Sequence, residues 1–315
     1  MGKSTSPKIV VLGGLNINLI AVGERMSELG ETLRGENFYS APGGKGANQA
    51  VGCSRLGAEV TMVGRVGDDI FGDELLVKLR NENVQIKDVA IDELSSTGVA
   101  VIFLDKIRQN RIIAVYGANG KCGTEEISSV SRLIEESDCL MLQQEIPLAA
   151  SIPAAKIARE KGKIVVWDPA PAMELPNEAY RFAQIMVPNQ IEAEYLTGIE
   201  VIDSDSAEMA ANILLSKGVE SVVIKMGSKG AYFSTGQNKG YIPAFNVNVK
   251  DTVAAGDAFG AGFAVSYSDT NDFETSVKFG VAAGSLSVTS EGAMDSMPTL
   301  GSVIELLGNS KSINN

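Results

Sequence analysis

Short apolar segments alternate with helical patterns along most of this chain, and no other feature restricts its fold as strongly. The apolar segments have the length of buried strands and lie at residues 8–14, 59–64, 139–143, 163–167, 184–187 and 221–226. Helical patterns fill most of the gaps, for example at residues 46–56, 71–81, 148–161, 207–217 and 256–268. This alternation predicts an α/β fold with a mostly parallel, doubly wound sheet, whose ligands lie beyond the carboxyl ends of the strands.

Two stretches interrupt the alternation, residues 16–40 and residues 97–116. In the second, the apolar runs VAVIFLD and RIIAVY flank a polar segment at residues 106–110, which is typical of an antiparallel hairpin. We expect the two stretches to form a small second sheet inserted into the main domain, and a lid is its natural role. The alternative is an ordinary hairpin at the edge of the main sheet.

Composition excludes several classes of function. The formal net charge is −12, so the phosphates of duplex nucleic acid would be repelled, and nucleic acid is not expected as a partner. The chain has no histidine, which excludes Ser-His-Asp triads, Cys-His pairs and His-ligated metals. Any general base is therefore Asp, Glu, Lys, Tyr or Cys.

Cysteine spacing and hydropathy bear on where the protein works. Cys53, Cys122 and Cys139 form no CxxC pair, and an odd number of isolated cysteines is typical of reduced thiols. No apolar run is long enough to cross a membrane, and no signal peptide precedes the first strand. We therefore expect a cytoplasmic protein without a membrane partner.

Residues 251–259 (DTVAAGDAF) carry the strongest chemical signal. The small residues Ala254, Ala255 and Gly256 come first, and Asp257 follows where a helix is expected to begin. Small side chains let a ligand approach the backbone, and a helix N-terminus offers unpaired N–H groups and the positive end of a dipole. These features predict an anion hole for a transferred phosphoryl group, with Asp257 as the base that accepts a proton from an attacking hydroxyl. The alternative is an Asp that caps an ordinary helix.

A Gly-rich turn also leads into a helix at residues 41–50 (APGGKGANQA). It is not a Walker A loop, because neither Ser nor Thr follows Lys45. We interpret Lys45 and Asn48 as polar groups that are presented to a small ligand. A plain helix-entry turn is the alternative.

Two further loops follow predicted strands. Asn189 and Glu192 are three residues apart and can share a helical face, and an amide with a carboxylate there suits hydrated Mg²⁺ beside phosphates. Residues 225–230 (KMGSKG) form a Gly-punctuated loop after the next strand. The alternatives are a polar first turn of a surface helix and a plain connecting turn. Each loop is a weak signal alone, but four such loops after strands all indicate phosphate chemistry.

Six motifs make the chain resemble the ribokinase family of sugar and nucleoside kinases over about residues 8–307. They are GGKGANQA at 43–50, STGVA at 96–100, GAN at 117–119, PAPA at 169–172, NxxE at 189–192 and DTVAAGDAF at 251–259. The first and the last are together highly specific. The resemblance implies one Rossmann-like domain over residues 1–315, with the small sheet as a lid that often clasps a second subunit, so a homodimer is expected.

The resemblance also implies a reaction and its cofactors. The γ-phosphoryl group of ATP would pass to the primary hydroxyl of a small sugar, with ribose, giving ribose 5-phosphate, as the first expectation. Mg²⁺ would accompany ATP, and K⁺ would act as a monovalent activator. The base would be Asp257, and the anion hole would be formed by Ala254, Ala255 and Gly256.

Binding residues are implied in three groups. The sugar pocket would draw on Asn16, Asn18, Gly44, Lys45, Gly46, Asn48, Glu145 and Asp257. The nucleotide would meet Asn189, Glu192, Lys225, Gly227, Ser228, Gly230, Gly256 and Val281. A potassium site would use Asp251, Val253, Ser287, Ser290, Gly292 and Ser296.

Four positions depart from the family pattern. Asn18 stands where the family places an Asp that holds the sugar hydroxyls, and Ala114 replaces a larger aliphatic residue in the lid. Asp168 replaces the usual Asn before PAPA, and Val281 stands where a His is common near the adenine. The catalytic set is intact, so these departures bear on ribose preference rather than on kinase activity.

Three functions are therefore compared. The first is a kinase for ribose, and the second is a kinase of the same family for a ketohexose, deoxyribose or a nucleoside. The third is a catalytically silent regulator that binds a sugar. Gly256, Asp257 and the NxxE motif argue against the regulator, which needs neither a base nor a metal site. ADP release measured against a panel of sugars separates the three.

Overall fold

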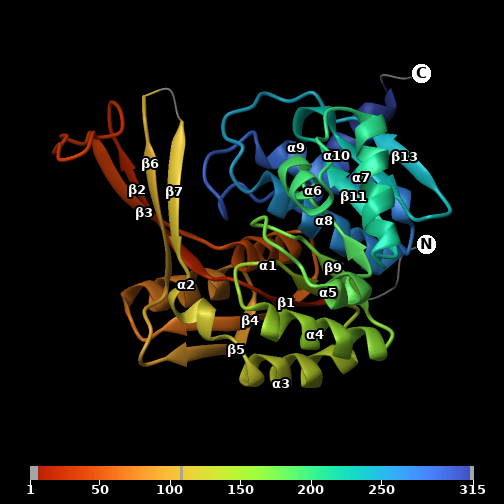
Figure 1. Cartoon of the computed structure of the whole chain (residues 1–315), viewed down its shortest axis with the longest axis horizontal. Coiled ribbons are helices and arrows are strands. Elements are labelled where there is room, and N and C mark those ends of the chain that lie inside the picture. Colours follow the sequence, from red (N-terminus) through yellow and green to blue (C-terminus); the bar gives the residue numbers. More distant parts are fainter. Residues whose placement is uncertain (1–5, 107–108, 313–315) are drawn as a thin grey trace.

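The computed structural model describes residues 6–106 and 109–312, which form a nine-stranded sheet and a separate four-stranded sheet (Figure 1). The larger sheet has the strand order β13-β12-β11-β10-β9-β8-β1-β4-β5. Its strands from β11 to β5 are parallel, whereas β12 and β13 are antiparallel at one edge. The strands are β1 Lys8–Leu12, β4 Glu59–Gly67, β5 Gln85–Asp92, β8 Cys139–Leu142, β9 Ile164–Trp167, β10 Ile185–Met186, β11 Ser221–Lys225, β12 Ala231–Ser234 and β13 Lys239–Ile242.

Helices cover both faces of the larger sheet because its strands are apolar on both faces. Ile9 and Val11 of β1 pack on one side, and Val10 and Leu12 pack on the other. The first side is covered by α1 Lys45–Arg55, α2 Ile70–Asn81, α8 Ala255–Thr270, α9 Phe273–Ser287 and α10 Leu300–Ser312. The second is covered by α3 Thr124–Leu133, α4 Leu148–Glu160, α5 Asn177–Phe182, α6 Gln190–Thr197 and α7 Ser204–Ser216. Short 3-10 helices complete the connections, namely η1 Gly117–Lys121, η2 Ile134–Glu136 and η3 Gly227–Lys229.

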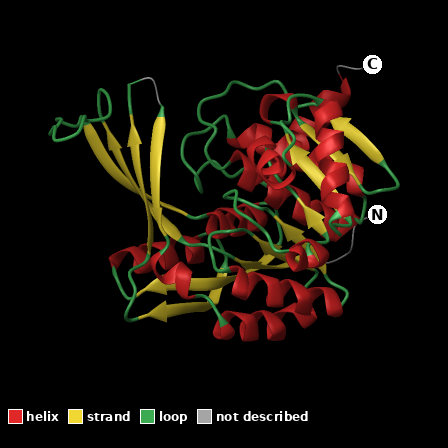
Figure 2. Ribbon diagram, viewed as in Figure 1, coloured by secondary structure: helices red, strands yellow, loops and turns green. Residues whose placement is uncertain are grey.

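The smaller sheet projects to one side of the α/β layers, as Figure 2 shows. Its strand order is β3-β2-β6-β7, with β2 Asn16–Val22, β3 Asn37–Gly43, β6 Gly98–Leu104 and β7 Asn110–Val115. β6 and β7 form the predicted antiparallel hairpin, and β2 joins it as a parallel neighbour of β6. β3 continues to Gly43, beyond the expected limit at residue 40, so the small sheet leads directly into the Gly-rich turn before α1.

The prediction of an α/β fold with a doubly wound, mostly parallel sheet and a small second sheet is confirmed. The sequence patterns did not reveal β5 or the β12–β13 hairpin. β5 alternates half-buried and exposed residues, because it lies at an edge, and so it lacks the apolar run of a central strand. Both kinds of element lie at the outer edges of the sheet.

Cys53, Cys122 and Cys139 are free and buried. In the part of the chain that the structure describes, no helix is long and apolar enough to span a membrane. The cytoplasmic location stays a prediction.

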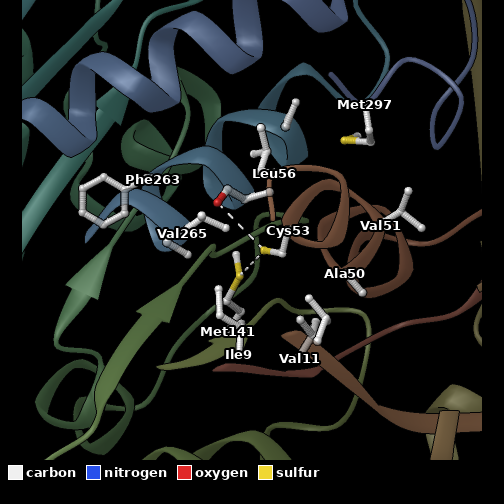
Figure 3. Packing of buried hydrophobic residues seen from close by; sticks show 14 of the residues in the cluster. Ile9, Val11, Ala50, Val51, Cys53, Leu56, Met141, Phe263, Val265 and Met297 are labelled. Carbon is white, nitrogen blue, oxygen red and sulfur yellow. Dashed lines mark hydrogen bonds between the residues drawn. The ribbon is translucent and has the colours of Figure 1, made fainter. Parts of the chain in front are cut away.

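Helix α1 packs closely against α8 over the centre of the sheet (Figure 3). The Cys53 thiol lies 3.5 Å from the Met141 sulfur of β8 and 3.9 Å from the carbonyl oxygen of Ala261. A Cβ atom added to Gly52 would lie 2.8 Å from the Ala261 Cβ, so the two helices touch where this glycine has no side chain. This contact, between the C-terminal part of α1 and the middle of α8, sets how closely the two helices pack.

The start of α1 is also in backbone contact with the end of β1. A Cβ atom on Gly46 would lie 2.7 Å from the carbonyl carbon of Gly13 and 2.8 Å from the Gly14 nitrogen. Gly44, which precedes the helix, has φ 92°, a backbone conformation that residues other than glycine rarely adopt. The turn therefore requires glycine, both for its conformation and for the close approach.

Replacing Gly46 with Ala is expected to lower the free energy of unfolding by about 1–3 kcal/mol, because the added methyl group meets backbone that must shift. Urea unfolding measures the change. Gly301→Ala in α10 is the matched control, since nothing lies within 4 Å of its added Cβ. The control should be neutral or stabilising by up to about 1 kcal/mol. Equal stability changes in the two variants would contradict the proposed backbone contact.

Candidate active site

The residues of the site lie at the carboxyl ends of five neighbouring parallel strands. The turn with Gly44 follows β3 and lies against Gly14, just after β1. Glu145 follows β8, Asp168 follows β9, Asn189 follows β10, and Lys225 ends β11. The chain leaves β1 toward β4 on one side and later reaches β8 on the other. Such a reversal opens a crevice at the strand ends where α/β proteins bind ligands.

Asp257 lies in the first turn of α8, is only 4% exposed and is held by two side chains of α1. Its Oδ2 accepts a hydrogen bond from Asn48 Nδ2 at 2.8 Å, and its Oδ1 accepts a longer one from Gln49 Nε2 at 3.3 Å. The alternative interpretation, a helix-capping Asp, does not hold, because the residue before the helix is Ala254 and Asp257 lies inside it.

A buried network extends from Asp257 across the strand ends. Gln49 Nε2 also donates to Asp168 Oδ2 at 3.0 Å, and Gln49 Oε1 accepts from Gln143 Nε2 at 2.6 Å. Lys225 Nζ donates to Asp168 Oδ1 at 2.8 Å, forming a buried ion pair. The network fixes the orientation of the Asp257 carboxylate through α1, β8, β9 and β11.

The electrostatics of this region depend on two lysines and four carboxylates. Burial raises the pKa of Asp257, while the nearby Lys45 ammonium opposes that rise. Burial lowers the pKa of Lys45, but the surrounding carboxylates of Asp257, Asp168, Glu145 and Glu192 outweigh burial and raise it overall. A carboxylate whose pKa is raised binds a proton more readily, which suits Asp257 to the role of a general base.

The backbone before α8 is strained. Ala254 adopts φ 60° and ψ 11°, the left-handed region that disfavours a side chain by about 1–2 kcal/mol. Such conformations are concentrated at functional sites. The first N–H groups of α8 have no partner within the helix, and they belong to the turn formed by Ala254, Ala255 and Gly256. The predicted anion hole therefore has a backbone suited to it.

A cavity of about 630 Å³ lies beside this helix end. Six of the residues expected to meet the nucleotide line it, namely Lys225, Gly227, Ser228, Gly230, Gly256 and Val281. Ala255 and Thr252 close the end near Asp257, and Phe245, Val247 and Val249 supply apolar walls. Its volume and its mixed lining are typical of a nucleotide-sized pocket.

Asn189 and Glu192 do not line this cavity, and they bond to each other instead. Asn189 Oδ1 accepts from the Glu192 backbone N–H at 2.9 Å, and Glu192 Oε2 accepts from the Asn189 N–H at 2.7 Å. This is a capping box at the start of α6, which matches the alternative of a polar first turn. Burial raises the pKa of Glu192 while Lys225 lowers it, so the carboxylate lies close to the charged network.

The predicted sugar residues lie along β2, the Gly-rich turn and the loop after β8. Glu145 Oε2 accepts from the Lys45 N–H at 2.7 Å, and burial raises the pKa of Glu145 to about 7. Asn16 is buried, with its Oδ1 bonded to Asn119 Nδ2 at 2.9 Å, so this amide supports the loop. Asn119 also bonds both backbone groups of Leu15, which explains the GAN motif as a brace for the segment after β1.

Asn18 and Ala114, two of the departures from the family pattern, lie in one row across the small sheet. The register pairs Asn18 with Ala41 and with Ala100, and pairs Ala100 with Ala114. Side chains in such a row share a face of the sheet. The amide of Asn18 therefore has methyl groups directly opposite it on both neighbouring strands, and its Nδ2 lies against Gly43, where an added Cβ atom would be 2.4 Å away.

The residues proposed for a potassium site lie in two segments, the loop before α8 and the end of α9 with the loop that follows it. Asp251 accepts from the N–H groups of Val253 at 3.0 Å and Gly292 at 3.1 Å. Ser290 N–H bonds to the Ser287 carbonyl at 3.2 Å. The hydroxyls of Ser287 and Ser296 both donate to backbone carbonyls, and so each keeps oxygen lone pairs. Among the described residues, no group of three or more His, Cys, Asp or Glu forms a metal cluster.

Sequence patterns did not identify Gln49, Gln143 and Asp168 as site residues. Gln49 lies within the motif at residues 43–50, but its partners Gln143 and Asp168 are 94 and 119 residues away in the sequence. The cavity wall at residues 244–249 was also missed, because it has no regular structure. Its alternating run AFNVNV directly before the anion-hole segment was the available signal.

Comparison with known proteins agrees with this geometry. The family model described as "pfkB family carbohydrate kinase" matches residues 6–300. The chain is 38% identical over 299 residues to a ribokinase from Haemophilus influenzae, covering 95% of this chain and 98% of the relative. It is 35% identical over 293 residues to a deoxyribokinase from Salmonella typhi, covering 93% and 96%.

A solved structure supports the same assignment. The ribokinase of Arabidopsis thaliana, determined in complex with ribose and ATP, superposes with a TM-score of 0.91 at 33% identity. The match covers 96% of this chain and 99% of that one. The sequence match, the strand order and the arrangement around Asp257 lead to one conclusion: this chain belongs to the pfkB family of carbohydrate kinases.

Proposed function

We propose that this protein transfers the γ-phosphoryl group of ATP to the primary hydroxyl of ribose, giving ribose 5-phosphate and ADP. The observation that carries the proposal is Asp257, a buried carboxylate in the first turn of α8, at the mouth of a strained turn that borders a nucleotide-sized cavity. Relatives named ribokinase, and the ribokinase structure with ribose and ATP, support both substrates.

The residues divide the reaction between them. Asp257 accepts the proton of the sugar hydroxyl as its oxygen attacks the γ-phosphorus, and Asn48 and Gln49 keep the carboxylate in place. The N–H groups of the first turn of α8 stabilise the negative charge of the transferred group. The apolar walls at Phe245, Val247 and Val249 receive the nucleoside part of ATP. A silent regulator would have no use for this arrangement.

We also propose metal ions at two places. Glu192 is a buried carboxylate beside the charged network, and carboxylate and water oxygens suit Mg²⁺, which would neutralise phosphate charge. Glu192 would bind it through water, since its oxygens already cap α6. Asp251, the hydroxyls of Ser287, Ser290 and Ser296, and the backbone at Val253 and Gly292 offer oxygen atoms that suit K⁺.

We propose further that residues 1–315 form one domain, with residues 16–40 and 97–116 as its lid. The lid would place one face of the small sheet, the face with Asn18, toward the sugar. The opposite face carries Phe38, Val101, Ile113 and Val115, each at least 45% exposed. One small sheet cannot bury these side chains alone, so the lid would also join two subunits.

Replacing Asp257 with Asn is expected to reduce kcat by ~10²–10⁴-fold, because the amide cannot accept the proton and the chain has no histidine to substitute. ADP release with ribose measures turnover, and calorimetry with ATP shows whether the nucleotide still binds. Binding should persist. Near-normal turnover in a folded variant would disprove the role of Asp257.

Asn18→Asp is expected to lower KM for ribose by about tenfold, because a carboxylate accepts from two adjacent hydroxyls more strongly than an amide does. The native chain is expected to discriminate less between ribose and 2-deoxyribose than the Asp variant, since deoxyribokinases are among its relatives. Both KM values are measured with both sugars. An unchanged or higher KM for ribose in Asn18→Asp contradicts the prediction.

The native protein is expected to sediment as a dimer at micromolar concentration, and Ile113→Asp is expected to make it monomeric. Ile113 belongs to the apolar face opposite Asn18 and is 68% exposed. Ile112→Asp is the matched control. Ile112 is the neighbour of Ile113 in the sequence, and its side chain is 53% exposed on the other face of the sheet. A monomeric native protein would refute the dimer. Dissociation by Ile112→Asp alone would show that the dimer interface lies on the face with Ile112 and not on the face with Ile113.

A further inference from the structure

Lys225 is a cation held in a fixed position beside the predicted anion hole. It ends β11, is 8% exposed as a residue and lines the cavity together with Ala255 and Gly256. A Cβ atom on Gly256 would lie 3.3 Å from Lys225 Nζ, so the ammonium group rests against the backbone of the first turn of α8. Gly256 directly precedes Asp257, so the cation and the base occupy the same end of the helix.

Asp168 orients the ammonium group of Lys225 but accepts only one of its hydrogen bonds. An ammonium has three N–H donors, and one of them is directed to Asp168 Oδ1 at 2.8 Å. Asp168 Oδ2 accepts from Gln49, whose amide also reaches Asp257. The cation and the base are therefore linked through two intervening side chains, and each restricts where the other can lie.

A buried lysine at this place needs an explanation, because ion pairs of this kind are costly to bury and are often replaceable by apolar residues without loss of stability. The explanation that we infer is a negatively charged ligand on the side of Lys225 that faces away from Asp168. The cavity that Lys225 faces would hold the polyphosphate of ATP, and the helix end that it touches would receive the transferred group. The position is thus suited to a second source of positive charge beside the helix dipole.

We propose that Lys225 is a catalytic residue that donates to the transferred phosphoryl group, and that Asp168 is the residue that positions it. The inference deepens the proposed function and rests on it. In the step, a bond forms between the sugar oxygen and the γ-phosphorus, and the bond from that phosphorus to the bridging oxygen breaks. The electron pair stays on the β-phosphate of ADP, and the hydroxyl proton goes to Asp257. Lys225 keeps its proton and stabilises the charge shared by the equatorial oxygens.

The test compares Lys225→Met with the double variant Lys225→Met/Asp168→Asn. The single variant leaves Asp168 buried without its partner, so its loss could come from a disturbed fold. The double variant removes both charges and keeps the hydrogen bond acceptor for Gln49. We expect kcat to fall by ~10²–10³-fold in both variants, as when one donor of an oxyanion hole is removed. Recovery of activity in the double variant would show a structural ion pair and overturn the proposal.

A binding measurement distinguishes catalysis from structure. We expect ADP to bind both variants as it binds the native protein, while ADP with aluminium fluoride and ribose, which mimics the transferred group, binds far more weakly. Equal losses for the two probes would overturn the proposal, as would a near-native kcat in folded Lys225→Met. Lys78→Met is the matched control, because Lys78 pairs with Asp295 at 2.7 Å outside the cavity. A native protein that phosphorylates no sugar would instead refute the proposed function itself.

Discussion

The contact between the backbones of Gly13 and Gly46 is the constraint on which the rest of the site depends. It sets the start of α1 against the end of β1, closer than any side chain would allow. The contact between Gly52 and Ala261 then sets α8 against α1. Together they leave Asn48 and Gln49 within hydrogen-bonding distance of Asp257. The position of Asp257 is thus determined by glycines, and its orientation by two amides.

Charge in the site is balanced locally rather than by the protein as a whole. The chain carries a net charge of −12, and four carboxylates surround Lys45. A polyphosphate would be repelled by that arrangement if no local cation or dipole opposed it. The N-terminus of α8 and the ammonium of Lys225 supply positive charge at one end of the cavity only. This asymmetry favours one orientation of a bound nucleotide, with its phosphates toward Asp257.

The fold class could be predicted from the sequence, and the anion hole could be proposed from it, because both depend on neighbours along the chain. The alternation of strands and helices is local, and Ala254 to Asp257 are contiguous. The network through Gln143, Gln49 and Asp168 was out of reach, since its bonds join residues about a hundred positions apart. Asn189 and Glu192 show a different limit. Their spacing suits both a metal ligand pair and a capping box. The structure shows the capping box, and a role of Glu192 toward Mg²⁺ stays a proposal.

The small sheet explains why two departures from the family pattern belong together. Asn18 and Ala114 are 96 residues apart in numbering, yet they lie in one cross-strand row with Ala41 and Ala100. An amide both donates and accepts, so it can pair with a hydroxyl in either direction, whereas a carboxylate only accepts. The methyl groups of Ala41 and Ala100 beside Asn18 leave space and need no hydrogen-bond partner. If this face binds the sugar as proposed, it would select the sugar by shape more than by charge. It would also tolerate the loss of one hydroxyl better than a carboxylate would, because no buried charge is left unpaired.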